Sequence, residues 1–125
     1  MSKVHEAASF TCHITVKQPL LSVKVSGHAL AVDMLNSYYE AIEIAKMEGA
    51  EKILIDMREL YMGYESFDML NVMTILEKKL TPFKVARLVN NQFRKNAFLQ
   101  ELASNKNILL RNFRNEDEAN LWLCG

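Results

Sequence analysis

The sequence has few of the features that mark secreted, membrane-spanning or repetitive proteins. It has two cysteines, Cys12 and Cys124, at opposite ends and without CxxC or zinc-ligand spacing, so we expect reduced thiols and no disulfide. The first eight residues lack the cationic flank and apolar core of a signal peptide, and no later apolar run is long enough to span a bilayer. These absences predict one cytoplasmic domain over residues 1–125.

Glycine and catalytic motifs are also scarce. The four glycines form no group, which argues against a phosphate-binding loop, and the chain has no GxSxG, P-loop, GxGxxG or HExxH pattern. His5, His13 and His28 are too scattered to indicate a metal cage. We therefore expect a protein that binds a partner and catalyses no reaction, with no cofactor and no metal.

The net charge is zero, but acids and bases are segregated along the chain. Residues 29–77 carry three bases and ten acids, whereas residues 78–114 carry nine bases and one acid. Two interpretations stay open: the two halves face each other across the fold or across a dimer, or a basic face binds an anionic partner.

A nucleic-acid interface is the sharpest form of the second interpretation. Phe93 or Phe98 would then stack on bases, but these aromatic residues have the spacing of a helix core, and the isoelectric point is near 6.8. The sequence thus argues against nucleic-acid binding. The basic stripe would consist of Arg87, Arg94, Lys95, Lys106, Arg111 and Arg114.

Apolar patterning predicts an α/β protein. Strands are expected at residues 9–16, 20–27, 52–57, 84–89 and 107–113, and helices from about residue 31 to a Gly49 cap, at 66–80, at 92–103 and at 116–123. Gln18-Pro19 favours a hairpin between the first two strands. The expected fold is a mostly parallel sheet of about five strands with an N-terminal hairpin and about four helices.

The strand at residues 52–57 is the expected centre of the fold. Its apolar residues are interrupted only by Asp56, which is typical of a parallel strand covered on both faces. Ligands of open α/β sheets collect outside the carboxyl ends of the strands, so residues 58–65 are the expected functional loop. Asp56 either marks a pocket or, as we prefer, caps the following turn.

The helix at residues 66–80 carries apolar side chains in too many directions for one face against a sheet. Methionines cluster around it and suit adaptable contacts. The pattern predicts a dimer interface, a protein-binding surface or an apolar-ligand site; the plain alternative is that the methionines fill the core. The candidate binding residues are Met62, Tyr64, Glu65, Ser66, Phe67, Met69, Val72 and Met73.

Four segments carry a resemblance to a known family: VSG at residues 25–27, ILIDMREL at 53–60, KVARLV at 84–89 and RNFRNEDEANLWL at 111–123. With the order of elements, they resemble a STAS domain over residues 10–123, and most closely the stand-alone bacterial SpoIIAA-like proteins, named after an anti-sigma-factor antagonist. The resemblance implies a regulatory, protein-binding role. Some SpoIIAA-like proteins also resemble the lipid-binding Sec14 fold, which keeps a lipid carrier as the alternative.

Phosphorylatable antagonists of this family carry Asp-Ser-x-Gly after the central strand. Here the corresponding residues are Tyr64-Glu65-Ser66-Phe67, so Glu65 occupies the acceptor position and Ser66 is one residue out of register. The resemblance therefore carries no kinase-controlled switch to this chain. Ser66 remains a weak phosphorylation candidate, and the alternative is that it caps the helix.

The sequence thus predicts a regulatory or protein-interaction module, with a protein partner or a second copy of itself as the occupant of its surface. The alternative is a carrier or sensor of an apolar small molecule held between Met62, Tyr64 and the helix. An interaction module should have a dry core and an exposed apolar patch on this helix, whereas a carrier should have a cavity behind it.

Overall fold

The structure, a computed structural model, describes residues 2–7, 9–90 and 93–125, with the backbone alone for residues 2, 3, 5–7, 66 and 93–95. Six strands and four helices alternate in the predicted order after an initial β-meander. They are β1 (Ser2–Ala7), β2 (Phe10–Lys17), β3 (Leu20–Ala29), α1 (Ala31–Glu48), β4 (Lys52–Met62), α2 (Ser66–Leu80), β5 (Lys84–Leu88), α3 (Phe93–Asn105), β6 (Leu109–Phe113) and α4 (Glu116–Cys124).

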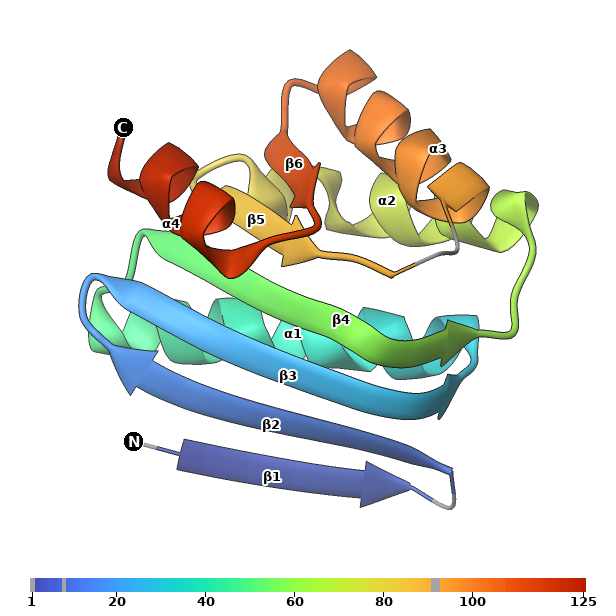
Figure 1. Ribbon diagram of the computed structural model, residues 1–125, viewed down its shortest axis with the longest axis horizontal. Helices are drawn as coiled ribbons and strands as arrows, with labels where there is room; N and C mark the ends of the chain where they lie inside the picture. Colours follow the sequence, from blue (N-terminus) through green and yellow to red (C-terminus); the bar gives the residue numbers. More distant parts are fainter. Residues whose placement is uncertain (1, 8, 91–92) are drawn as a thin grey trace.

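The strands form one sheet in the order β1-β2-β3-β4-β5-β6 (Figure 1). The β1–β2 and β2–β3 pairs are antiparallel, and the three later pairs are parallel. This confirms the predicted α/β fold with an N-terminal hairpin. β1 was not predicted from the sequence, because a short edge strand with one partner leaves little apolar alternation to detect.

Two cores lie on opposite faces of the sheet. Because right-handed crossovers that advance in one direction place their helices on one face, α1, α2 and α3 share the larger core, and α1 lies behind β3 and β4 in Figure 1. The smaller core joins α4 to β5 and β6 and includes Leu54, Phe113 and Leu123. The rest of that face, over β2 and β3, carries polar residues, as expected for antiparallel strands with one solvated side.

The central strand is longer than expected. β4 continues to Met62, so the expected loop 58–65 shrinks to residues 63–65. A β-bulge in β4 places residues 57 and 58 opposite the single residue Val25 of β3 and shifts the register by one. Regular pairing then resumes and continues to the Ala29–Met62 pair. Beyond Asp56, β4 has no backbone pairing with β5. The Asn90 side chain, which follows β5, instead donates from Nδ2 to the Leu60 carbonyl at 2.7 Å and links the two segments there.

The helix ends follow the predicted signals with one correction. Gly49 has φ 72° and closes α1, and Asn115 Oδ1 accepts from the Glu118 amide at 3.0 Å at the start of α4. Ser66 is not the cap of α2: it is the first helical residue, and the extended Glu65 takes the cap position. The helix predicted from residue 92 begins at Phe93; Gln92 lies outside the described residues.

Candidate functional site

The predicted binding residues divide between the core and the surface. Five of them are buried: Met62, Tyr64, Met69, Val72 and Met73. Glu65 and Phe67 are exposed, and the side chain of Ser66 lies outside the described part of the chain. Of the predicted binding residues whose side chains are described, Glu65 and Phe67 at the start of α2 are the ones on the surface.

The methionines fill the core, which was the plain alternative. Met57, Met62, Met69 and Met73 are each almost fully buried within the larger core, where α2 packs on the sheet. The hollows described below lie elsewhere on the molecule. Binding of an apolar small molecule behind α2 therefore stays a prediction.

Among the described residues, five of the ten exposed large apolar side chains lie at one end of the molecule, where β3 and β4 end and α1 and α2 begin. We call this group the apolar edge. The exposed fractions are 61% for Leu30, 55% for Tyr61 and 69% for Phe67. The full group is Leu30, Val32, Tyr61, Phe67 and Leu70.

Backbone contacts bring the ends of β3 and β4 close to the starts of α1 and α2, with Tyr61 on the open face of the sheet because Leu60 and Met62 on either side of it face the larger core. His28 pairs with Tyr61 across β3 and β4, and their rings lie 5.2 Å apart. The Gly63 amide donates to the Ala29 carbonyl at 3.0 Å, so the chain leaving β4 stays beside the chain entering α1. Since α1 and α2 also contact each other, their first turns share one edge, on the right of Figure 1.

Acidic side chains occupy both helix starts at this edge. Asp33 Oδ2 accepts from the Leu30 amide at 2.8 Å, and Asp68 Oδ2 accepts from the Glu65 amide at 3.2 Å. These carboxylates already use the positive ends of the two helices. The apolar edge is therefore suited to apolar contacts, and these two backbone amides, which already donate to carboxylates, are not open to a phosphate.

A second group of polar residues lies at the carboxyl ends of β5 and β6. Arg87 is 1% exposed, although a guanidinium remains charged in a protein. Its Nη2 donates to Asn96 Oδ1 at 2.7 Å and its Nε lies 3.0 Å from Met57 Sδ, whereas Nη1 has no hydrogen-bond partner among the described residues. Arg87 also takes part in none of the ion pairs between described side chains.

Neighbouring groups extend this polar cluster. Asn112 is the cross-strand partner of Arg87; its Nδ2 donates to the Asn96 carbonyl at 2.6 Å and its amide to Gln100 Oε1 at 2.8 Å. Burial raises the pKa of the Tyr64 phenol, against the opposing effect of the Arg87 charge. This cluster was not predicted from the sequence, where the one signal for it is an arginine within the apolar strand KVARLV.

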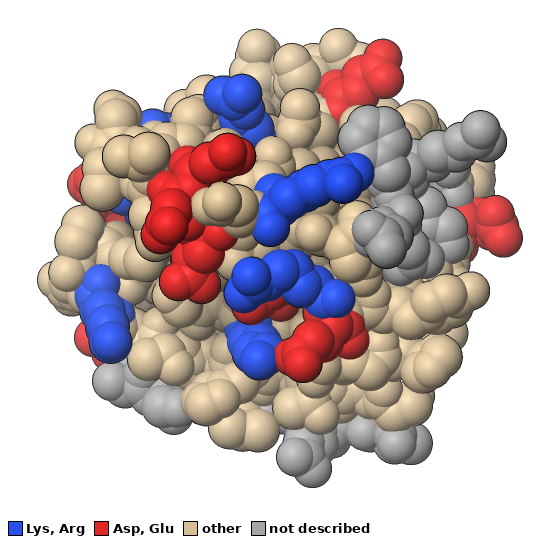
Figure 2. Space-filling view, in the orientation of Figure 1, with Lys and Arg blue, Asp and Glu red and all other residues tan. Residues whose placement is uncertain are grey.

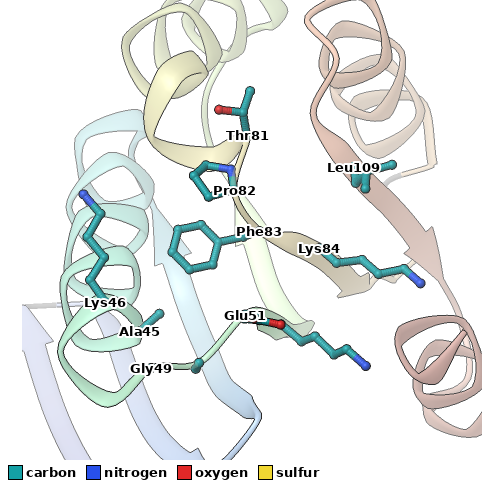
Figure 3. Close-up of a pocket in the computed structure, with 11 residues that line it drawn as sticks. Ala45, Lys46, Gly49, Glu51, Thr81, Pro82, Phe83, Lys84 and Leu109 are labelled. Carbon is teal, nitrogen blue, oxygen red and sulfur yellow. The ribbon is translucent and has the colours of Figure 1, made fainter.

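A larger hollow lies at the other end of the strands, beside the residues where β4, β5 and β6 begin. It has a volume of about 650 Å³ and lies between the ends of α1 and α2 (Figure 3). Figure 3 shows Lys46 and Lys84 directed away from each other, and the Lys84 ammonium lies 4.6 Å from the centre of the Trp122 ring. Lys46 and Lys84 therefore do not converge on one ligand position.

Charged side chains on the open face of the sheet are paired with one another. Lys24 Nζ lies 2.9 Å from Glu59, and Arg58 donates to both carboxylate oxygens of Asp56 at 3.0 and 2.9 Å. Figure 2 shows both signs of charge side by side over the centre of this face. Asp56 thus forms a local pair with Arg58, whose backbone amide also donates to Asp56 Oδ1 at 3.1 Å. Because β4 continues to Met62, no turn follows Asp56, and the predicted turn-capping role is wrong.

The acidic and basic halves of the chain pack against each other through β4 and β5 and through α2 and α3, but one ion pair joins them among the described side chains. Lys106 Nζ, one residue after α3, lies 3.9 Å from Glu77 of α2. Arg87, one member of the expected basic stripe, is buried, and Phe98 packs partly against the core. The side chains of Arg94 and Lys95 lie outside the described part of the chain.

The fold is of the SpoIIAA-like, or STAS-like, class. An uncharacterized protein of the DUF3478 family with a SpoIIAA-like fold, from Shewanella loihica PV-4, is 21% identical, with a TM-score of 0.60 over 96% of this chain and 98% of that chain. An anti-sigma factor antagonist from Mycobacterium paratuberculosis is 19% identical, with a TM-score of 0.63 over 97% of this chain and 100% of that chain. At these identities the likeness shows the fold alone.

Comparison with models of protein families finds no match, and comparison with curated protein sequences finds none either. Among the described residues, no helix is long and apolar enough to cross a membrane. The same residues contain no group of three side chains that would hold a metal ion.

Proposed function

We propose that this chain is a non-catalytic regulatory module that binds another protein through the apolar edge. The observation that carries the proposal is the exposure of Leu30, Tyr61 and Phe67 at adjoining ends of strands and helices. Large apolar side chains gathered on one surface mark interaction sites more often than scattered ones do. An aromatic residue such as Phe67 would serve as the anchor of the contact.

The fold supports the same proposal. One structural neighbour is named as an anti-sigma factor antagonist, which is a protein that acts on another protein. The apolar edge lies at the carboxyl ends of β3 and β4, where open α/β sheets usually place their function. A location in the cytoplasm, expected from the sequence, remains part of the proposal.

The test uses two charge substitutions at exposed apolar positions. Phe67→Asp changes the apolar edge, and Met47→Asp changes a side chain that is 75% exposed near the other end of α1. Because both side chains are exposed, the free energy of unfolding of each variant should lie within about 0.5 kcal/mol of that of the unchanged protein. Thermal unfolding followed by circular dichroism checks this condition.

Tagged forms of the three proteins are then compared for capture of partners and for mass in solution. We expect Phe67→Asp to lose a captured protein that Met47→Asp retains. If the unchanged protein is a dimer and Phe67→Asp is a monomer, the partner is a second copy of this chain. Equal capture and equal mass for all three proteins would contradict the proposal.

The alternative of an apolar-ligand carrier is tested separately. Native mass spectrometry of freshly purified protein is compared with its denatured mass. A bound mass that is lost on denaturation would be a noncovalent ligand and would favour a carrier. The buried methionine side chains would then have to move apart to make room for the ligand. Phe67→Asp should leave such a mass unchanged, since Phe67 lies outside the core.

A further inference from the structure

A hollow of about 530 Å³ lies between α3 and α4, beside the carboxyl end of the edge strand β6. We call it the amide hollow, because four carboxamide side chains line it. Two arginines and one glutamate, Glu118, add charge to its wall. The polar lining consists of Asn96, Gln100, Asn112, Asn115, Arg111 and Arg114.

The buried Arg87 lies directly behind this lining. It donates to Asn96, which lines the hollow and is itself 2% exposed, and it pairs across the strands with Asn112, which also lines the hollow. Arg87 Nη1, a donor, is buried without a hydrogen-bond partner among the described residues. Asn112 Oδ1 also lacks one there, but this oxygen is an acceptor and needs a donor rather than an anion. Buried polar atoms without partners are rare in native proteins and call for an explanation.

The positive charges of Arg87 and of the two lining arginines outnumber the one lining carboxylate, Glu118, and so favour an anion in the amide hollow. Arg87 has no acidic partner among the ion pairs between described side chains. Because the effective dielectric constant is low around a buried group, the positive charge of Arg87 acts over several ångströms. Arg111 adds a second charge at the wall, where it lies over the Phe113 ring at 5.5 Å. Gln100 uses its oxygen for the Asn112 amide, which leaves its amino group as a donor.

We propose that the amide hollow binds a small molecule through a carboxylate or phosphate group. Arg111 and the Gln100 amino group would contact the oxyanion, and Arg87 would stabilise its charge from behind Asn96. The position agrees with the rule that ligands of open α/β sheets bind outside the carboxyl ends of the strands. The proposal does not depend on the apolar edge, which lies at the ends of β3 and β4.

The test is an NMR titration of the ¹⁵N-labelled full chain. Inorganic phosphate and succinate are added in separate experiments, and sodium chloride keeps the ionic strength constant. The signals to follow are the side-chain amides of Gln100 and Asn112 and the backbone amides of residues 109–115. The variants are Arg111→Gln and Arg87→Met, and Lys46→Gln is the matched control, because it removes one positive charge at the other end of the strands.

We expect saturable shifts at these signals with at least one of the two anions, and the anion that saturates identifies the source of the oxyanion. Loss of the Arg111 contact or of the Arg87 charge should weaken binding by about tenfold or more in Arg111→Gln and in Arg87→Met, whereas Lys46→Gln should bind as the unchanged protein does. Should Arg87→Met fail to fold, Arg111→Gln decides alone. Shifts that do not saturate, or that both arginine variants retain, would overturn the proposal and leave a buried water as the partner of Arg87 and Asn112.

Discussion

Arg87 provides the sharpest prediction about stability, because it is a buried charge without an acidic partner among the described ion pairs. We consider two substitutions. Arg87→Met keeps most of the apolar stem and removes the charge, whereas Arg87→Lys keeps a charge and removes the planar group that reaches Asn96. If burial of the charge costs stability, the methionine variant should be the more stable of the two.

The contacts of Arg87 set the expected magnitudes. Burial of an ion costs several kcal/mol, and the one strong bond that offsets it here is the 2.7 Å contact to Asn96, worth about 1.5 to 3 kcal/mol. Arg87→Met removes both terms. The Asn96 oxygen loses its donor, but Asn96 lines the amide hollow, so water can replace the guanidinium. We expect the free energy of unfolding to stay level or to rise by about 1 kcal/mol, and that of Arg87→Lys to fall by about 2 kcal/mol.

Urea unfolding measures these changes, followed by circular dichroism and by the fluorescence of Trp122, the one tryptophan of the sequence. The buffer must contain neither phosphate nor carboxylates, because a bound anion would stabilise the unchanged protein alone. A difference of 1 kcal/mol corresponds to roughly 4 °C in the unfolding temperature of a domain of this size. If Arg87→Lys unfolds at higher urea than Arg87→Met, the charge stabilises the fold and our reasoning is wrong.

Three further predictions concern other parts of the fold. Gly27→Ala should lose about 2 kcal/mol or more, because Gly27 has φ +90° and an added Cβ would lie 2.1 Å from the Ser9 oxygen; Gly63→Ala, with 3.6 Å to its nearest atom, should change the urea midpoint little. Cys124 should react with a thiol reagent at once and Cys12 only after unfolding, since Cys12 is buried and burial raises the pKa of its thiol; two fast thiols in the native protein would contradict this. Burial acts to raise the pKa of Asp56, but bonds from the arginine two residues later outweigh it and hold that pKa below its usual value. The carboxylate therefore contributes stability above its unfolded pKa of about 3.9 that is lost as the pH falls further, and Asp56→Asn should show a shallower acid-unfolding curve.

Local sequence signals predicted most elements of the fold. Gly49, Asn115 and Pro82 mark helix ends that the structure places within a residue or two of the prediction, because caps and breakers act on their neighbours in the chain. The length of β4 was wrong for the opposite reason. Its second half is held by pairing with β3 beyond a bulge and by the side chain of Asn90, and both contacts join residues far apart in the sequence.

The candidate site was harder to predict, because exposure depends on how α2 lies on the sheet. Phe67, Leu70 and Ile75 are on its outer side, while Met69 and Val72, within the same apolar run, are buried. Composition alone does not divide such a run into inner and outer faces when nearly every position is apolar. The group around Arg87 was missed for a related reason: Arg87, Asn96 and Asn112 come from three elements, and only the packing of α3 over β5 and β6 brings them together.

An apolar side chain at position 87 would suit the packing of β5 better than the arginine that is present. Its neighbours Val85, Ala86 and Leu88 are fully buried, and one nitrogen of Arg87 lacks a partner among the described residues. Proteins break such local rules mainly at functional sites. The stability and binding experiments are therefore linked. Without an anion, Arg87→Met should be at least as stable as the unchanged protein, and added phosphate or succinate should no longer raise its free energy of unfolding. If Arg87→Met is equally stable and still responds fully to phosphate or succinate, Arg87 has no part in anion binding, and its burial needs another cause.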